Sequence, residues 1–356
     1  MDINVATRNY EQWLAKRIPV VRVDLERKHR QMRKEPFRFL RATYYRWLQV
    51  REGLGNKLPV APRILAVGDL HIENFGTWRD REGRLIWGIN DFDEADVLPC
   101  TDDLIRLVCS AILARTIGRM RLRPVDICEA VLLGYDECLA EGGLPFVLAE
   151  EHHWLREAAM NDLRDPVPFW KKLAGSRERA QAVPSSARSI LRSALPASAS
   201  TPRITRRSAG VGSLGRPRYL ATLRWNGSWI AREVKAVVPS ALSWVTGRDR
   251  PVRYTQILRS AVRCPDPFVD IRNGWLVRRL APDCSRIELE TLPRRYDEYR
   301  LMHAMGWETA NIHIGGAAPR DLRAHLRRLD RDWLPSAAEV MLEALHEDWR
   351  QYRRRR

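Results

Sequence analysis

The chain has 356 residues, of which 45% are hydrophobic, and a formal net charge of +17 at pH 7. This length and composition predict a globular protein with a sizeable core, built as two domains or as one large two-lobed unit. No run of eighteen apolar residues occurs and the first residues lack the apolar stretch of a signal peptide, so we expect no membrane span and a cytoplasmic location.

Arginine and cysteine content restrict the function further. Only seven of the 61 basic residues are lysine, and the arginines are scattered along the whole chain. This distribution permits incidental contact with polyanions and does not predict a dedicated nucleic-acid surface. Six cysteines without a CxxC pair predict free thiols, mostly in the core, instead of a disulfide framework or a zinc site.

The first third of the chain shows two kinds of apolar pattern. Apolar and aromatic residues at helical spacing predict two helices within residues 24–50, separated at Pro36 because proline interrupts a helix. Two apolar runs of strand length follow at residues 63–67 and 85–89, and each leads into an acidic turn. A helix whose acidic start suits the helix dipole is expected over residues 104–112.

The rest of the chain combines helical patterns with one β-rich region. Residues 174–202 are rich in Ala, Ser, Pro and Arg and predict a linker or a mobile insertion. Asn226-Gly227 between two alternating runs predicts a β-hairpin, and residues 268–280 predict two further short strands. Further helices are expected at residues 124–141, 150–173, 250–263, 290–313 and 319–352.

The two acidic turns carry the strongest functional signal. Asp69 follows the first strand with Asn74 five residues later, and Asp91 and Asp93 follow the second strand. Carboxylate and amide oxygens are suited to holding Mg²⁺ and to orienting or deprotonating an acceptor hydroxyl in phosphoryl transfer. The plainer alternative is that Asp69 and Asn74 only cap a turn and that the second segment is an ordinary acidic bend. The residue types, together with both spacings, favour the catalytic interpretation.

A glycine-rich segment adds a second signal. Gly210, Gly212 and Gly215 have the GxGxxG spacing, which alone marks a tight turn as readily as a phosphate site. A dinucleotide-binding fold requires these glycines to open a helix, whereas a hairpin follows them here. A glycine-rich loop between antiparallel strands, with Lys235 on the next strand, is instead the arrangement with which protein kinases hold ATP phosphates. The alternative for Lys235 is an exposed strand lysine.

These segments resemble two related groups of proteins. Gly68-Asp69-Leu70-His71-x-x-Asn74, Ile89-x-Asp91-Phe92-Asp93 and Asp103-Leu104 are similar to the catalytic core of aminoglycoside and choline phosphotransferases in the kinase-like superfamily. More closely, most of the chain except its C-terminal third resembles an uncharacterised bacterial family, domain of unknown function 2252. The motifs that carry this resemblance are Lys28 to Arg41 with Pro36-Phe37-Arg38-Phe39, Gly68-Asp69-x-His71-x-x-Asn74-Phe75-Gly76, Asn90-Asp91-Phe92-Asp93-Glu94 and Val211-Gly212-Ser213-Leu214-Gly215.

The resemblance implies a site for ATP, or another nucleoside triphosphate, and Mg²⁺, with an unidentified acceptor as the second substrate. It implies that Asp69 is the catalytic base and that Asn74 and Asp91 are metal ligands. The phosphates would be held by Gly210, Gly212, Ser213, Gly215 and Lys235. Supporting roles would fall to His71, Asp93 and Asp103, with Asp103 as a buried brace for the catalytic loop.

The resemblance also implies an α+β, two-lobed protein kinase-like fold with a mostly helical larger lobe. The glycine segment follows the catalytic Asp instead of preceding it, so the fold is expected to be circularly permuted. Residues 268–280 would then form the hinge. The expected parts are a catalytic half of the helical lobe (1–173), a linker (174–202), a small β-rich nucleotide-binding lobe (203–282) and C-terminal helices that complete the large lobe (283–356).

Departures from the kinase pattern keep other functions open. Gln256 stands where a Glu should orient Lys235, and Glu233 stands where a small residue is usual, so Lys235 would be held by Glu233 or Asp91, or poorly. A catalytically weak regulatory or binding module is therefore an alternative, and nucleotidyl transfer is another. A binuclear metallophosphoesterase would also begin with Asp69-x-His71, but its downstream histidine ligands lack a matching setting. The acceptor and the oligomeric state are not specified by the sequence.

Overall fold

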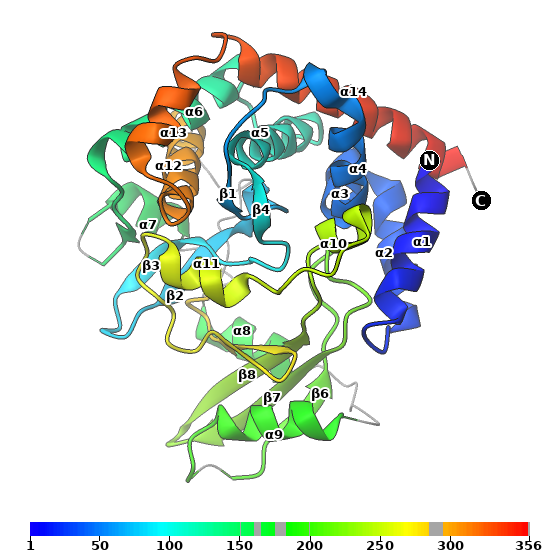
Figure 1. Cartoon of the computed structure of the whole chain (residues 1–356). Helices are drawn as coiled ribbons and strands as arrows, with labels where there is room; N and C mark the ends of the chain where they lie inside the picture. Colours follow the sequence, from blue (N-terminus) through cyan, green and yellow to red (C-terminus); the bar gives the residue numbers. More distant parts are fainter. Residues whose placement is uncertain (150, 160–164, 175–182, 199, 285–294, 355–356) are drawn as a thin grey trace.

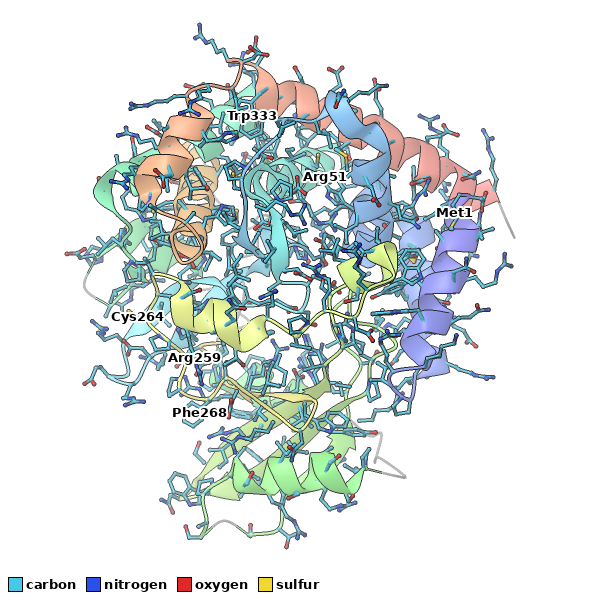
Figure 2. The ribbon with its side chains drawn as sticks, viewed as in Figure 1. Met1, Arg51, Arg259, Cys264, Phe268 and Trp333 are labelled. Atoms are coloured by element: carbon cyan, nitrogen blue, oxygen red, sulfur yellow. The ribbon has the colours of Figure 1, made fainter. Side chains whose placement is uncertain are left out.

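The computed structural model describes residues 1–149, 151–159, 165–174, 183–198, 200–284 and 295–354. Its fold is mixed α+β, as predicted, with a large helical part and a smaller antiparallel sheet that protrudes on one side of it (Figure 1). Side chains fill the space between the elements (Figure 2) and form one large apolar cluster in the helical part. A second apolar cluster lies between the small sheet, a helix packed on it and the end of the first helix.

Four helices form the N-terminal region, namely α1 (Ile3–Ala15), α2 (Arg22–Lys34), α3 (Pro36–Ala42) and α4 (Tyr44–Leu54), followed by a short 3₁₀ turn, η1 (Gly55–Lys57). The break at Pro36 occurs as predicted. Glu35 has extended backbone (φ −156°, ψ 150°), because the proline ring disfavours helical geometry in the residue before it. A second break at Thr43 (φ −126°, ψ 38°) was not predicted, so the region 24–50 holds three helices instead of two.

The segments that carry the acidic turns lie in the centre of the helical part. The strands pair antiparallel, β1 (Arg63–Ala66) with β4 (Asp96–Pro99), and β3 (Leu85–Ile89) with both β2 (Phe75–Arg79) and β5 (Phe146–Val147). The helices α5 (Cys100–Thr116), α6 (Pro124–Glu141) and α12 (Arg295–Ile314) surround them (Figure 1). A Cβ on Gly134 of α6 would lie 2.0 Å from the carbonyl oxygen of His303 in α12, so only glycine allows this close helix packing.

The remaining helices of this part are α7 (His153–Ala159), α13 (Pro319–Leu326) and α14 (Trp333–Arg354), whereas α8 (Pro166–Ala174) packs Phe169, Trp170 and Leu173 against the small sheet (Figure 1). Two helices therefore replace the single helix expected over residues 319–352. Helix α14 packs along α1, α2, α3 and α4, so the last described helix lies beside the first (Figure 1). None of the described helices combines the length and apolar character needed to cross a bilayer. All six cysteines are free, as predicted, and four are buried.

The small sheet has the spatial order β6 (Arg203–Arg206), β7 (Arg218–Trp225), β8 (Ser228–Ala236), β10 (Trp275–Leu280) and β9 (Asp270–Arg272), with every pair antiparallel. Asn226 (φ 47°) and Gly227 (φ 83°) form the predicted two-residue turn. Helices α10 (Leu242–Thr246) and α11 (Tyr254–Ser260) follow β8. The prediction that residues 268–280 form a hinge is wrong, because β10 is paired on both edges inside the sheet.

The segment 174–202, predicted as a linker or mobile insertion, contains a packed helix. Helix α9 (Ser185–Ser193) buries Ala187, Ile190 and Leu191 against the face of the small sheet. These residues have helical spacing, but the surrounding Ser, Pro and Arg masked the pattern in the sequence. Residues 175–182 and 199 of this segment lie outside the described residues.

Candidate active site

The backbone after β1 is held by a glycine and a buried carboxylate. Gly68 has a positive φ of 85°, and a Cβ there would lie 2.4 Å from the carbonyl oxygen of Glu94. Asp103, fully buried in the first turn of α5, accepts hydrogen bonds from the N–H groups of Val67 (2.7 Å) and Gly68 (2.8 Å). His313 of α12 lies 3.0 Å from the same carboxylate. These contacts fix the chain that leads to the predicted catalytic base.

That residue, Asp69, is paired with a buried arginine. Arg106 of α5 donates to Asp69 Oδ1 through Nε at 2.9 Å and through Nη2, and its guanidinium lies 4.8 Å from the ring centroid of Trp47. A Cβ on Gly212 would lie 3.5 Å from Asp69 Oδ2. Burial raises the pKa of Asp69, although Arg106 acts in the opposite direction. One carboxylate oxygen is thus fixed and the other faces the glycine segment.

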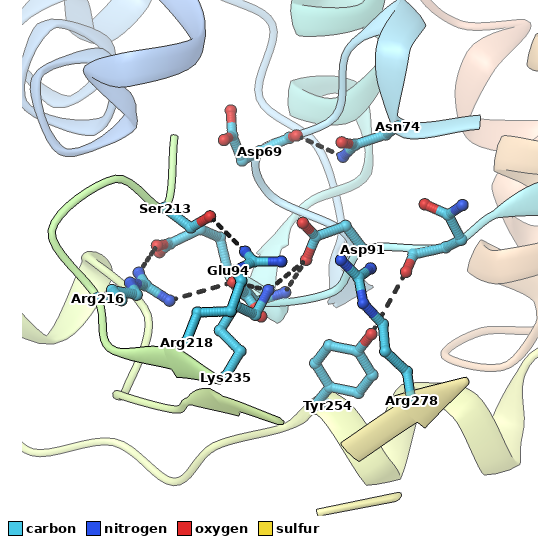
Figure 3. A network of polar contacts seen from close by, with 12 residues as sticks. Asp69, Asn74, Asp91, Glu94, Ser213, Arg216, Arg218, Lys235, Tyr254 and Arg278 are labelled. Atoms are coloured by element: carbon cyan, nitrogen blue, oxygen red, sulfur yellow. Dashed lines mark hydrogen bonds and ion pairs between the residues drawn. The ribbon is translucent and has the colours of Figure 1, made fainter. Parts of the chain in front are cut away.

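Asn74 and Asp91 are brought together by the β2–β3 hairpin. Asn74 ends a short 3₁₀ turn, η2 (Ile72–Asn74), and its Nδ2 donates to the main-chain oxygen of Asp69 at 2.7 Å (Figure 3). The amide therefore directs its donor at the catalytic loop. The N–H of Asn90 donates to the carbonyl of Asn74 at 3.1 Å, which brings the neighbouring Asp91 to the same place. The side chain of Asp91 is 38% exposed.

Lys235 extends from β8 to the acidic turn Asn90 to Glu94 that follows the β2–β3 hairpin; the hairpin and this turn together are here named the acidic hairpin. Its side chain is only 1% exposed, and its Nζ lies 2.5 Å from Asp93 Oδ2 and 3.5 Å from Asp91 Oδ1 (Figure 3). Burial opposes the ionisation of Asp93, but the ammonium of Lys235 and the guanidinium of Arg216 outweigh it and lower the pKa of Asp93 to about 2. The hairpin itself therefore supplies the carboxylates that hold the lysine.

Two other residues considered as partners of Lys235 are engaged elsewhere. Gln256 accepts a hydrogen bond from Arg253 at 2.7 Å. Glu233 is surrounded by three guanidinium groups, those of Arg207, Arg218 and Arg278. Burial alone would raise the pKa of Glu233, but these three positive groups hold it well below its usual range. Of the alternatives considered for Lys235, Glu233 is not its partner, whereas Asp91 does lie beside it.

The glycine segment, Gly210 to Gly215, lies between β6 and β7 and approaches the loop that carries Asp69. Gly210 (φ 75°) and Gly215 (φ 98°) have backbone angles that favour glycine. A Cβ on Gly212 would lie 2.9 Å from the carbonyl oxygen of Arg41, so this position requires glycine for close approach. Ser213 Oγ accepts a hydrogen bond from Nη2 of Arg218 in β7 at 2.8 Å.

His71 ties the catalytic loop to the N-terminal helices. Its Nδ1 accepts from the N–H of Glu73 at 3.1 Å, and its Nε2 lies 3.3 Å from Nε of Arg41, the last residue but one of α3. Arg41 also pairs with the carboxylate of Glu73. His71 thus contacts both Arg41 and the N–H of Glu73, and these are the contacts through which its predicted supporting role would operate.

Arg216 was not identified from the sequence. It directly follows the glycine segment and donates to Asp93 at 3.2 Å and to Glu94 at 2.9 Å (Figure 3). Glu94 also accepts from the N–H of Ala241 at 2.6 Å, and burial raises its pKa to about 7. Because arginine occurs throughout this chain, no sequence signal distinguishes Arg216 or Arg106 from the others.

A cavity of about 60 Å³, here named the site cavity, lies between these groups. The predicted residues that line it are Asp69, His71, Asn74, Asp91, Asp93, Gly210, Gly212 and Ser213. Lys28 of α2 lines it as well, is 5% exposed, and makes a long hydrogen bond of 3.4 Å to the carbonyl of Gly212. Burial lowers the pKa of Lys28 to about 8. The scarcity of lysine, which drew attention to Lys235, was a signal for Lys28 too.

The oxygen atoms at the hairpin fit a hard cation. The buried Oδ1 of Asp93 has no hydrogen-bond partner among the described residues, and Asp91 is partly exposed beside it. Mg²⁺ binds through one or two carboxylates together with phosphate oxygens and water. This donor set is therefore sufficient for Mg²⁺ with a phosphate ligand, although the described residues form no cluster of three or more His, Cys, Asp or Glu that could hold a metal alone.

Fold and site together define a mixed α+β protein in which a lysine from a small antiparallel sheet meets an acidic hairpin of a helical part. Residues 21–144 match the family described as "Uncharacterized protein conserved in bacteria (DUF2252)". This match contains Asp69, Asn74 and Asp91 but ends before the glycine segment and Lys235, so it is shorter than the sequence resemblance implied. No curated protein and no solved structure matches the chain.

Proposed function

We propose that the protein is an ATP- and Mg²⁺-dependent phosphotransferase that acts on a hydroxyl group of a small molecule. The contact of Lys235 with Asp91 and Asp93 carries this proposal. It joins a lysine of the type that binds phosphates to carboxylates of the type that hold Mg²⁺, across two parts of the fold. A purely structural ion pair would give no reason for the glycine segment to meet Asp69 at the same place.

A circularly permuted, two-lobed kinase-like fold is part of this proposal. The glycine segment lies between the antiparallel strands β6 and β7, and Lys235 lies on the next strand, β8, which is the arrangement that grips ATP phosphates in kinases. The packing of α1 against α14, near the two chain ends, supports permutation because neighbouring termini tolerate reconnection.

Asp69 is suited to receive the proton of the acceptor hydroxyl. Arg106 holds its Oδ1, so Oδ2 is the oxygen that faces the glycine segment. The raised pKa that burial gives this carboxylate favours proton transfer near neutral pH. Arg106 thus orients the base without neutralising the whole effect of burial.

Asn74, Asp91 and the unpaired Oδ1 of Asp93 would hold Mg²⁺. The phosphates would be held by the N–H groups of the glycine segment and by Lys235, which contacts Asp91 and Asp93 but does not itself line the site cavity. Bound ATP and Mg²⁺ supply the phosphoryl group and the neutralisation of its charge during transfer. The chain's own residues orient the acceptor hydroxyl and exclude water under the glycine segment.

Nucleotide entry requires a movement of the glycine segment or the small sheet. The site cavity of about 60 Å³ is much smaller than the roughly 300–1,000 Å³ of typical small-molecule sites, so a nucleoside triphosphate does not fit in it. The pairs Lys235 with Asp93 and Arg216 with Glu94 connect the two parts and must rearrange on opening.

The test measures Mg²⁺-dependent ATP binding and ATP consumption in the presence of a metabolite pool. Asp91→Asn and Lys235→Met are expected to weaken ATP binding at least about tenfold, since each removes a charge that contacts metal or phosphate. Asp69→Asn is expected to bind ATP normally and lose consumption. Asp321→Asn on α13, whose side chain is 70% exposed, is the matched control. ATP consumption at the wild-type rate by Asp69→Asn and Asp91→Asn would refute the site assignment.

A second candidate is a kinase-shaped binding or regulatory module with weak or no turnover. The small site cavity and the existing pairing of Lys235 favour it. Binding of ATP by the wild type without consumption in any acceptor pool would support this candidate, and release of pyrophosphate instead of ADP would indicate nucleotidyl transfer. A binuclear metallophosphoesterase has less support, because Arg106 already occupies Oδ1 of Asp69, where a metal would bind.

A further inference from the structure

A second cavity, of about 330 Å³, lies on the other side of the acidic hairpin and is here named the arginine cavity. It is enclosed by Thr77 and Trp78 of β2, by α11 and the segment after it, and by β10. Asn90 and Phe92, on either side of Asp91, also line it, yet it shares no described lining residue with the site cavity. Its volume is in the range of small-molecule binding sites.

Positive side chains from four segments converge on this cavity, namely Arg207, Arg259, Arg263, Arg278 and Arg279. Two carboxylates also line it. Asp270 is already paired with Arg272 at 2.8 Å, and Asp266 accepts a hydrogen bond from the N–H of Phe268 at 2.9 Å. Of the five arginines, Arg207 and Arg278 share the single carboxylate of Glu233. The lining therefore has an excess of positive charge.

Three of these arginines have no carboxylate within 4.0 Å among the described residues. Arg263 donates to the carbonyl of Ile89 at 3.1 Å, and Arg279 donates to the carbonyl of Arg79 at 3.2 Å. The buried Nε atoms of both have no hydrogen-bond partner in the described part of the chain. Arg259, near the end of α11, is exposed and also lines the cavity.

Aromatic rings hold two of these guanidinium groups in place. Arg263 lies over Trp78 (4.7 Å to the centroid) and Phe92 (5.1 Å), and Arg279 lies over Phe268 (4.6 Å). Burial lowers the pKa of Arg263, although the nearby carboxylate of Glu308 acts in the opposite direction. A half-buried, preoriented guanidinium whose buried Nε lacks a partner among the described residues destabilises the protein alone, and an oxyanion that binds it in the planar fork removes this cost.

We propose that the arginine cavity binds a small molecule with at least two anionic oxygen groups, of the phosphate or pyrophosphate type. The ligand would be bound by the half-buried Arg263 and Arg279 and by the exposed Arg259. Its phosphates would belong either to a nucleotide or to a separate phosphorylated metabolite. The proposal goes beyond the phosphotransferase proposal, because it requires binding and no turnover.

Isothermal titration of the full chain with inorganic pyrophosphate tests it. We expect binding to the wild type, about tenfold weaker binding to Arg279→Met and about threefold weaker binding to the exposed Arg259→Met, as loss of charge-assisted hydrogen bonds implies. Arg320→Met on α13, whose side chain is 89% exposed, removes the same charge elsewhere and should leave the affinity unchanged. Absence of binding to the wild type, or equal affinities for all four proteins, would overturn the proposal.

A measurement on the unmodified protein protects this test against misfolded variants. Cys284 lines the cavity, whereas Cys264 is half-buried outside its lining. Saturating pyrophosphate should slow alkylation of Cys284 by N-ethylmaleimide severalfold and leave Cys264 unchanged, and equal rates with and without pyrophosphate would contradict the proposal. Competition between pyrophosphate and a non-hydrolysable ATP analogue would identify the nucleotide as the source of the phosphates, and simultaneous binding would identify a separate metabolite.

Discussion

Replacement of Asp103 measures how strongly the buried carboxylate braces the catalytic loop. The side chain is fully buried, accepts hydrogen bonds from the N–H groups of Val67 and Gly68, and pairs with the buried His313. Each hydrogen bond to a charged acceptor contributes about 1.5–3 kcal/mol, so Asp103→Ala should lower the free energy of unfolding by about 3–6 kcal/mol. This is a large fraction of a typical stability of about 5–15 kcal/mol. Asp103→Asn keeps one acceptor oxygen, so its free energy of unfolding should fall by only about 2–3 kcal/mol.

Urea unfolding followed by circular dichroism gives these free energies, and Asp103→Asn is the informative variant because it should still fold. Asp321→Asn, at a 70% exposed position, is the control and should stay within about 0.5 kcal/mol of the wild type. ATP consumption by Asp103→Asn should also fall, since the displaced backbone carries Asp69. A loss of stability below about 0.5 kcal/mol in Asp103→Asn would show that the two N–H contacts do not hold the loop.

Three further predictions concern single substitutions at Glu308, Lys28 and two glycines. Burial raises the pKa of Glu308 from 4.5 to about 7, so the stability it contributes is present below pH 4.5 and is lost as the pH rises to about 7. Between pH 4 and pH 8, the free energy of unfolding measured in urea should therefore fall by about 3 kcal/mol less in Glu308→Gln than in the wild type. An equal fall in both proteins would contradict this assignment. Lys28→Met should be at least as stable as the wild type, because the substitution removes a buried charge. It should nevertheless bind ATP about tenfold more weakly in titration calorimetry, and an unchanged affinity would exclude a role of Lys28 in ATP binding. Gly53 in α4 has open space around it, so Gly53→Ala should raise the free energy of unfolding by about 0.5–1 kcal/mol. Gly212→Ala should lower it, because the new Cβ would meet the backbone of Arg41. Equal effects of the two substitutions would show that the glycine segment is not tightly packed against Arg41.

Local signals in the sequence were sufficient where one residue type determines the backbone. The hairpin turn at Asn226-Gly227 and the break at Pro36 occur where predicted, because few other residues suit those positions. Helix α6 spans the predicted residues 124–141, with Pro124 at its start and the left-handed Gly142 (φ 83°) after its end. The break at Thr43 carries no comparable signal, and it was missed.

The site was only partly predictable, because its contacts join distant segments. The spacing of Asp69, Asn74 and Asp91 identified the hairpin, and the structure brings all three to one cavity. The partner of Lys235 could not be read from the sequence, since Asp93 lies 142 positions away and no local rule links the two. Arg106 was hidden for a different reason, namely that arginine is abundant everywhere in this chain.

The two ion pairs that close the site have a kinetic consequence. Lys235 (1% exposed), Arg216 (5%) and their partners are shielded from solvent, so dissolved salt screens them little. A ligand for the site cavity must then wait until the pairs separate, and its association should be much slower than diffusion allows. Stopped-flow measurements should accordingly show an association rate that saturates with ligand concentration and changes little with ionic strength. The rate of ligand binding at this site would then be limited by the opening of the protein and not by the diffusional encounter with the ligand.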